Sequence, residues 1–336
     1  MRVFVTGGSG FLGKFIARRL LAEGREVAAY ARRPLPELEA LGARVFLGEL
    51  SDRRALGEAL AGADAAIHCA GRVGVWGPYA EFMSVNAEGT QSVLAAAERA
   101  GVSSFIYASS PSVVYGGRNL TGINESEPYL QTPLDNYSYS KAVAERAVLA
   151  ANKPGFRTLA LRPHLIWGPE DPHFTPRILS LRRRNRLRLF TGGPYVIDAT
   201  YIDNAVEAHL LAMARIMADE RVAGQAFFIA QDEPLDALEF INLLLKAARL
   251  APVAARTPPW LGRSLARLAE GAWRLGRLRG EPPLTLFAIK QLTTSHYFDL
   301  AKAKTLLGYK PKISLSEGLR RLEDYLFRDG GPDARP

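Results

Sequence analysis

The fold is decided by the stretch VFVTGGSGFLGKFIARRLLA, residues 3–22. It begins with a β-branched and aromatic run typical of a buried strand, and it ends with apolar residues at helical spacing. Between the two, Gly7, Gly10 and Gly13 form the pattern G-x-x-G-x-x-G. Glycines in this position let the backbone approach a pyrophosphate at the N-terminus of a helix. The stretch predicts a dinucleotide-binding turn, with contacts at Gly7, Ser9, Gly10, Phe11, Leu12 and Gly13.

Strand and helix signals alternate outward from this turn. Short apolar runs predict strands at 2–6, 26–30, 43–47, 65–69, 104–108, 158–162 and 225–229. Amphipathic runs predict helices at 11–23, 81–100, 137–151 and 201–217. Strands that alternate with helices are typical of a parallel sheet, because parallel strands need crossover connections. The expected fold class is α/β, a doubly wound parallel sheet of the Rossmann type.

The regular pattern is interrupted after Trp167-Gly168-Pro169 by a segment rich in Pro, Gly and Arg. We expect a cofactor-binding Rossmann core at 1–165 that is completed by 201–231. The remaining segments, 166–200 and 232–330, are expected to form a smaller interleaved C-terminal substrate-binding cap.

The composition excludes several classes of protein. The chain has 336 residues, 48% of them hydrophobic, which is enough for one large core. A single cysteine, Cys69, argues against a disulfide framework, and no stretch has the roughly 18 apolar residues of a membrane-spanning helix. The net charge is +9, and the densest basic runs, 181–188 and 263–279, come with no nucleic-acid-binding motif. We therefore expect a cytoplasmic protein that binds neither nucleic acid nor a metal.

The end of the second predicted strand indicates which dinucleotide binds. NAD sites usually place an acidic residue there to bond the ribose 2′-hydroxyl, whereas a 2′-phosphate needs cations. This chain has Arg32 and Arg33 in that position and no carboxylate. Two guanidinium groups suit a phosphate, so the sequence predicts NADP(H). The alternative is that both arginines only cap a loop.

A tyrosine and a lysine stand four residues apart in Tyr137-Ser138-Tyr139-Ser140-Lys141. Positions i and i+4 share one face of a helix, so the ammonium of Lys141 is expected near the phenol of Tyr137. A nearby positive charge lowers the pKa of a phenol and makes it a usable general acid or base. Tyr139 has no lysine four residues further on, so it is interpreted as a packing or substrate contact.

The predicted strand 104–108 ends in hydroxyl groups at the carboxyl edge of the sheet, where ligands of such folds bind. One hydroxyl there can hold a substrate carbonyl while Tyr137 protonates it. Ser109, Ser110 and Ser112 are all available, and the residues alone do not choose among them. His68 and Cys69 lie inside an apolar strand and are interpreted as core or pocket lining.

Taken together, the motifs resemble those of the extended short-chain dehydrogenase/reductases, in the 3β-hydroxysteroid dehydrogenase-like branch. The resemblance is carried by TGGSGFLG, FIYASSPSV, YSYSK followed by AVAERAVLAAN, LRPHLIWGPED and TYIDNAVEAHLLA. It implies that Ser110, Tyr137 and Lys141 are catalytic and that Lys141 also bonds the nicotinamide ribose. Further cofactor contacts are implied at Ala70, Gly71, Pro163 and His164.

The second half of the chain is similar to the bacterial 2-alkyl-3-oxoalkanoate reductases of long-chain olefin biosynthesis. The similar segments are LRPHLIWGP, RLRLF, TYIDNA, RGEPPLT and GYKPKISLSEGLRRL. This resemblance implies NADPH-dependent reduction of the 3-keto group of a long-chain 2-alkyl-3-oxoalkanoate to the 2-alkyl-3-hydroxyalkanoate. Adenine contacts are implied at Glu49 and Leu50, although the family usually has Asp where this chain has Glu49.

Other activities and partners stay open at this point. A 3β-hydroxysteroid dehydrogenase-like enzyme, a sugar-nucleotide epimerase or dehydratase and a non-catalytic redox-sensing protein share the scaffold. Trp76, Tyr79, Trp167, Trp260 and Trp273 are candidates for lining an apolar cleft, with core packing as the alternative. We expect a homodimer. The Leu-, Trp- and Arg-rich helix at 259–279 is either a cap helix with a solvated face or a surface that meets a membrane or other enzymes of the olefin pathway.

Overall fold

The computed structural model describes residues 1–74, 76–131, 135–276, 278 and 280–328. Its centre is a seven-stranded parallel sheet with the strand order β10-β7-β5-β4-β1-β2-β3. The strands are β1 (Arg2–Thr6), β2 (Glu26–Ala31), β3 (Arg44–Leu47), β4 (Ala65–His68), β5 (Ser104–Ala108), β7 (Arg157–Pro163) and β10 (Ala226–Ile229). The order reverses between β1 and β4, as in a doubly wound sheet, and the predicted α/β Rossmann class is confirmed.

The sheet is buried on both faces because successive side chains of each strand point to opposite sides. In β1, Val3 and Val5 belong to one hydrophobic core, whereas Phe4 between them belongs to a second core. All three side chains are completely buried. An apolar run without polar alternation is therefore what a central strand of this sheet requires.

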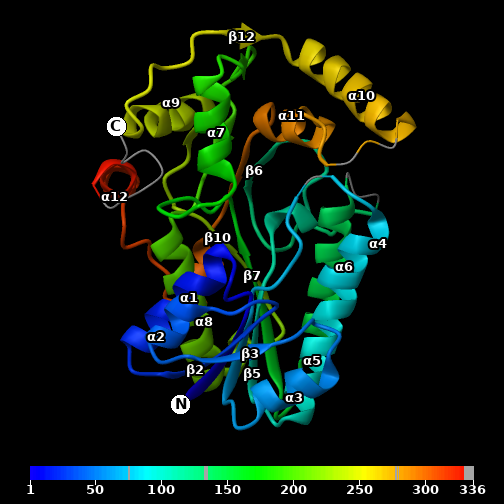
Figure 1. Ribbon diagram of the computed structural model, residues 1–336, viewed down its shortest axis with the longest axis vertical. Helices are drawn as coiled ribbons and strands as arrows, with labels where there is room; N and C mark the ends of the chain where they lie inside the picture. Colours follow the sequence, from blue (N-terminus) through cyan, green and yellow to red (C-terminus); the bar gives the residue numbers. More distant parts are fainter. Residues whose placement is uncertain (75, 132–134, 277, 279, 329–336) are drawn as a thin grey trace.

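Helices cover the two faces as separate layers (Figure 1). On one face α1 (Phe11–Ala22) packs against α8 (Ile202–Ala218), with the short α2 (Pro36–Ala40) beside them. On the other face lie α3 (Arg53–Leu60), α5 (Gly89–Arg99) and α6 (Asn136–Ala150). A short helix α4 (Tyr79–Phe82) and a π-helical segment, Met83–Glu88, lead into α5.

The upper part of the molecule holds two small sheets and the later helices (Figure 1). The first sheet has the order β11-β9-β13-β6, made of β6 (Leu120–Ile123), β9 (Val196–Ile197), β11 (Leu235–Asp236) and β13 (His296–Phe298). The second pairs β8 (Leu189–Phe190) with β12 (Arg256–Thr257). The helices are α7 (Phe174–Arg183), α9 (Ala237–Ala247), α10 (Pro259–Leu275), α11 (Leu286–Leu292) and α12 (Leu315–Phe327). None of these strands was expected from the sequence.

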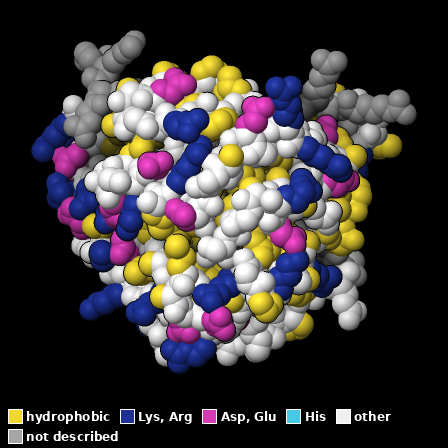
Figure 2. Space-filling view, turned by 90° about the horizontal axis from the view of Figure 1, so that it is seen from below, with side chains coloured by type: hydrophobic (Ala, Val, Ile, Leu, Met, Phe, Trp, Pro, Cys, Tyr) yellow, Lys and Arg dark blue, Asp and Glu magenta, His cyan; other side chains and the backbone are white. Residues whose placement is uncertain are grey.

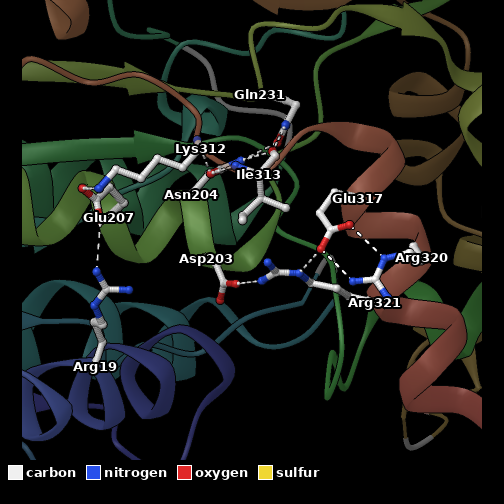
Figure 3. A network of polar contacts seen from close by, with 10 residues as sticks. All are labelled: Arg19, Asp203, Asn204, Glu207, Gln231, Lys312, Ile313, Glu317, Arg320 and Arg321. Atoms are coloured by element: carbon white, nitrogen blue, oxygen red, sulfur yellow. Dashed lines mark hydrogen bonds and ion pairs between the residues drawn. The ribbon is translucent and has the colours of Figure 1, made fainter. Parts of the chain in front are cut away.

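A polar network attaches the C-terminal segment to α8 (Figure 3). The amide of Asn204 donates to the carbonyl of Ile313, at 2.7 Å, and to Gln231, while its oxygen accepts from the backbone N–H groups of Lys312 and Ile313. Asn204 is buried, so each of these four bonds satisfies a group that water cannot reach. Beyond Lys312, Arg321 of α12 pairs with the carboxylate of Asp203 at 2.9 Å.

The face opposite to the upper part of the molecule carries charges of both signs. Figure 2, seen from below, shows Lys and Arg side chains interspersed with Asp and Glu, which is ordinary for a solvated surface. Across the ranges described, no helix combines the length and the apolar character that crossing a membrane requires.

Candidate active site

The glycine-rich turn between β1 and α1 is built for a close approach of backbone. Gly7 has a φ of +73°, and a Cβ placed on it would lie 2.8 Å from the backbone nitrogen of Ala70. A Cβ on Gly13 would lie only 2.4 Å from the carbonyl oxygen of Gly7, and the N–H of Gly10 donates to that same oxygen. No side chain of the described residues caps Gly10, and the first turn of α1 has no acidic residue. Its first N–H groups are therefore open to an anion.

The end of β4 is held against this turn by Thr6. Its hydroxyl accepts from the N–H groups of Cys69 and Ala70, at 3.1 and 3.0 Å, and donates to Nδ1 of His68. The Nε2–H of His68 donates to Thr90. His68 is completely buried, and burial lowers its pKa to about 3. It is a neutral core residue that fixes the backbone at Ala70, which confirms its interpretation as core or pocket lining.

Two further predicted contact regions follow β2 and β3. Arg32 and Arg33 are exposed directly after β2, and neither guanidinium pairs with an acidic side chain of the described residues. Glu49 is exposed after β3, and its carbonyl accepts a hydrogen bond of 2.9 Å from Tyr30. Leu50 packs close to Gly89, at the start of α5. All four residues follow the carboxyl ends of strands, the edge at which such sheets bind ligands.

Helix α6 begins at a carboxylate cap. The side chain of Asp135 accepts from the N–H of Ser138 at 2.8 Å and from its hydroxyl at 2.7 Å. This cap sets Tyr137 in the first turn and Lys141 one turn later. Of the turn expected before this helix, residues 133 and 134 lie outside the described residues. The helix is anchored further on by Glu145, which forms a fully buried ion pair of 2.6 Å with Arg162 of β7.

Ser110 is the serine that the fold brings to Tyr137. Its hydroxyl lies close enough to the phenol of Tyr137 to act on it, and it acts to lower the pKa of that phenol. The hydroxyl of Ser110 also accepts from the N–H of Ser112 at 3.2 Å. The hydroxyls of Ser109 and Ser112 are buried and have no hydrogen-bond partner in the described part of the chain. Of the three serines that the residues alone left open, Ser110 is therefore the one that acts on Tyr137.

The charge state of Tyr137 differs from the expectation. Burial raises the pKa of Tyr137 to about 12, Asp135 acts in the same direction, and only Ser110 opposes them. The expected lowering by Lys141 is wrong for this arrangement, because the ammonium points elsewhere. It donates to the carbonyl of Ala108 at 2.6 Å and lies 4.2 Å from the centre of the Tyr107 ring. A phenol that keeps its proton is a proton donor.

Lys141 is itself perturbed. Its side chain is buried, and burial lowers its pKa to about 7, although the neighbouring Cys69 and Glu145 act in the opposite direction. A lysine in this state exchanges its proton near neutral pH, which suits a residue that passes protons on.

Sequence reasoning missed two residues beside Tyr137. Asn86, in the π-helical segment, is buried and bonds both the N–H and the carbonyl of Arg72, and its amide also donates to Ser140 of α6. Arg72 lies 5.0 Å from the centre of the Phe82 ring, which in turn meets Tyr137 edge-on at 6.4 Å. A π-helical insertion often marks a functional site but has no sequence signal as clear as a glycine motif.

Pro163 and His164 continue β7 at the same edge and are buried. Nδ1 of His164 lies 2.8 Å from the carbonyl oxygen of Asp198, and Nε2 lies 2.9 Å from Nδ1 of His296. Nε2 of His296 lies 2.9 Å from the carbonyl oxygen of Gln291. Burial lowers the pKa of both rings, that of His164 to about 3, so the pair is neutral at pH 7. The histidines join the central sheet to β13 of the upper part.

The aromatic residues that were candidates for lining a cleft differ in how deeply they are buried. Trp167 is fully buried against Tyr201 and Phe240 and belongs to the core. Trp260 is 63% exposed on the outside of α10. Trp76 is half-buried beside Arg274, and the Tyr79 ring contacts that of Tyr139 on α6, with the ring centres 5.9 Å apart. Trp273 is half-buried on α10.

The sequence of the chain is similar to those of known oxidoreductases. A model of the 3-beta hydroxysteroid dehydrogenase/isomerase family matches residues 4–255. Two proteins named 2-alkyl-3-oxoalkanoate reductase are each 40% identical to the chain. The one from Shewanella oneidensis aligns over 95% of this chain and 85% of its own length, and the one from Stenotrophomonas maltophilia over 96% and 98%. A mouse sterol-4-alpha-carboxylate 3-dehydrogenase is 32% identical over 94% of this chain and 88% of its own.

Solved structures resemble the chain over nearly its whole length. The crystal structure of gox2253 has a TM-score of 0.78 at 25% identity and covers 98% of each chain. MoeE5 in complex with UDP-glucose and NAD has a TM-score of 0.74 at 25% identity, covering 98% of this chain and 99% of its own. The UDP-glucuronic acid 4-epimerase from Bacillus cereus shares the fold, with a TM-score of 0.72 at 22% identity over 97% and 98%. The chain belongs to the 3-beta hydroxysteroid dehydrogenase/isomerase family.

Proposed function

We propose that the chain is an NADPH-dependent reductase of the 3-keto group of long-chain 2-alkyl-3-oxoalkanoates, acting in long-chain olefin biosynthesis. The observation that carries the proposal is the position of Ser110 beside Tyr137, which lies in the first turn of helix α6 at the carboxyl edge of the sheet. A hydroxyl that fixes a carbonyl and a phenol that keeps its proton are the two groups that ketone reduction requires. The two relatives at 40% identity support the substrate class by their names.

The turn after β1 fits the pyrophosphate of a dinucleotide. A Cβ at Gly7 or Gly13 would collide with backbone atoms, so the turn leaves no room for a side chain at either position. The uncapped N-terminus of α1 offers N–H groups and the positive end of a helix dipole. Ala70 and Gly71 would hold the adjoining part of the cofactor, and Lys141, Pro163 and His164 its nicotinamide end.

Arg32 and Arg33 support NADP(H) over NAD(H). Both are exposed after β2, with no acidic partner in the described ranges, so their guanidinium groups are available to a 2′-phosphate. The segment after β2 has no carboxylate that could bond the 2′-hydroxyl of the NAD ribose.

The reaction is assigned to the residues as follows. When bound, the cofactor supplies a hydride to C3 of the substrate. Ser110 holds the ketone oxygen, and Tyr137 donates its proton to that oxygen, where negative charge develops. Solvent then restores the proton of Tyr137, and Lys141 would bond the nicotinamide ribose.

Arg72 supports an acidic substrate. Its guanidinium contacts the Phe82 ring, which also contacts Tyr137, and its Nε is buried without a hydrogen-bond partner among the described residues. Its ion pair with Glu81 is largely exposed and therefore weak. Arg72 is therefore the candidate partner for a substrate carboxylate two bonds from the ketone.

The test is reduction of a long-chain 2-alkyl-3-oxo acid, followed by the absorbance of the nicotinamide. Tyr137→Phe should lower turnover by at least about 10²-fold without lowering the thermal stability, because only the proton donor is lost. Tyr139→Phe, on the same helix, is the matched control and should turn over like the unmodified protein. Near-normal reduction by Tyr137→Phe would remove the assignment.

Cofactor choice is tested by binding. Arg32→Ala/Arg33→Ala should weaken NADPH binding by at least about tenfold and leave NADH binding unchanged. If steroids or UDP-glucose were turned over in place of the oxo acid, or if NAD were released only on unfolding, the proposed substrate class would be replaced by that of those relatives.

A further inference from the structure

Helix α10 turns large apolar side chains toward the outside of the molecule. On α10 and just after it, six such residues are exposed: Trp260, Leu261, Leu265, Leu268, Leu275 and Leu278. Leu268 is 70% exposed and Leu275 is 90% exposed. These six are half of all the large apolar side chains that are exposed in the described part of the chain. Apolar residues gathered in this way usually mark a surface that binds something.

The opposite side of α10 is the one that packs on the protein. Only Gly262 and Ala266 of this helix are buried, and Gly262 is pressed against the Phe190 ring. Glu270 points inward as well, since its carboxylate accepts from the first N–H of α11 at 2.7 Å. At 3.6 residues per turn, the exposed leucines lie on the side away from these contacts. Small residues hold the helix to the body while its larger apolar side stays uncovered.

The charged side chains at the surface of α10 are positive, with Arg267 and Arg274 exposed and Arg263 half-buried. Arg263, Arg267 and Arg274 fall into one narrow row along the helix, between its apolar side and its packed side. The one acidic residue of the helix, Glu270, is mostly buried. An apolar strip beside a row of arginines is the pattern of a helix that lies in the surface of an anionic bilayer.

The uncovered side continues toward the candidate active site. Arg274 lies 5.3 Å from the centre of the Trp76 ring, in the segment that follows β4. Two more exposed apolar residues, Val73 and Tyr79, belong to the same segment. The segment is tied to the catalytic helix by a hydrogen bond from Asn136 to the carbonyl of Gly77. In Figure 1, α10 and α11 lie above α6, and α4 lies beside its upper end.

We propose that α10 docks the protein on the surface of an anionic phospholipid bilayer, with its leucines among the acyl chains and its arginines at the phosphates. The docked flank is then the one that leads to Tyr137, so an apolar substrate passes from the bilayer to the site without crossing water. A second copy of the chain fits this face less well. An antiparallel two-fold interface places both arginine rows on the same side, and in either arrangement the one acidic residue of α10, Glu270, is mostly buried and offers no exposed partner for them. Lipid binding is independent of turnover and does not rest on the proposed reaction.

The test is flotation of the whole protein with vesicles of phosphatidylglycerol and phosphatidylcholine, compared with pure phosphatidylcholine. The unmodified protein should float with the anionic vesicles and lose much of this binding at high salt, because the arginine contribution is screened. Leu265→Asp/Leu268→Asp should lower the partition coefficient by at least about tenfold, since two side chains no longer enter the bilayer. Arg263→Glu/Arg267→Glu/Arg274→Glu should abolish the preference for phosphatidylglycerol.

Matched controls lie on the Rossmann part. Leu41 and Leu47 are exposed to a similar extent as Leu265, so Leu41→Asp/Leu47→Asp should float like the unmodified protein. Arg25→Glu/Arg53→Glu/Arg99→Glu makes the same change in net charge away from α10. Equal loss in the controls would show a nonspecific charge effect and overturn the proposal. Failure of the unmodified protein to float would also overturn the proposal. The same holds if the protein does not bind vesicles but self-associates in sedimentation, and Leu265→Asp/Leu268→Asp abolishes this self-association.

Discussion

Helices α10 and α12 lie in the same C-terminal third of the chain (Figure 1), and both are amphipathic, but only α12 buries large apolar side chains. Helix α12 buries Leu322 and Leu326, and its Gly318 lies so close to Tyr201 that a Cβ would come within 2.7 Å of the ring. Helix α10 buries only a glycine and an alanine. The apolar period of a helix therefore indicates that one side seeks an apolar environment, but not whether the protein itself supplies it.

The difference in packing between α10 and α12 is tested most directly by a leucine-to-alanine substitution in each helix. Leu322→Ala should lower the free energy of unfolding by about 2–5 kcal/mol, because it leaves a cavity under α12. Leu268→Ala should change it by no more than about 0.5 kcal/mol, because this side chain is already in water. Urea unfolding measures both. Equal losses would mean that α10 is packed in solution.

The polar attachment of α12 is tested at Asn204. Asn204→Ala leaves the N–H groups of Lys312 and Ile313 without an acceptor and should cost about 2–4 kcal/mol of unfolding free energy. The control is Asn242→Ala on α9, where a single N–H, that of Val253, loses its acceptor. This control should cost about 1 kcal/mol. A smaller loss for Asn204 than for Asn242 would contradict the role of the network in Figure 3.

Helix α8, to which the C-terminal segment is attached, carries a buried histidine that makes stability depend on pH. Burial lowers the pKa of His209 to about 4, although its bond to the carbonyl of Ala205 acts in the opposite direction. Between pH 4 and about 6.5 the unfolded chain binds a proton that the folded chain does not, so stability falls as the pH falls.

His209→Leu should remove this contribution. The slope of unfolding free energy against pH, measured by urea unfolding from pH 6.5 to 5, should decrease by at most about 1.4 kcal/mol per pH unit. An unchanged slope would show that His209 takes up its proton in the folded chain.

The smallest expected effect concerns the ion pair of Asp203 and Arg321. Both side chains are more than a third exposed, and burial raises the pKa of Asp203 while Arg321 acts against this. A double-mutant cycle with Asp203→Asn and Arg321→Gln should give a coupling of about 0.2–1 kcal/mol that decreases in salt. A coupling above this range would mean that α12 is held mainly by charge and not by Leu322.

The sequence predicted the central sheet well because each of its strands is a local apolar run. The expected strands at 2–6 and 104–108 agree with β1 and β5, and that at 26–30 is one residue shorter than β2. The upper sheets were missed because their strands are short and pair over long distances. His296 of β13, for instance, pairs with Leu120 of β6, and no local pattern records this.

At the site, the relative positions of residues in one motif could be predicted, whereas contacts between residues of different motifs could not. Tyr137 and Lys141 share one helix, and the glycines share one turn. The choice of Ser110 depends on how the turn after β5 is aimed, and the contact of Asn86 with Arg72 depends on a π-helical segment inside the helix expected at 81–100. The pKa of Tyr137 went the opposite way to the prediction because burial outweighs any neighbour.

The contact between His164 and His296 has a consequence for how the two imidazoles hold their protons. Both ends of the pair face a carbonyl oxygen, and a carbonyl only accepts. Two neutral rings own two N–H groups, while the three contacts need three. One contact is therefore always short of a proton, either at Asp198, at Gln291 or between the rings. Moving the missing hydrogen bond from Asp198 to Gln291 requires both rings to change tautomer. The tautomers of His164, next to the central sheet, and His296, in β13, are therefore coupled.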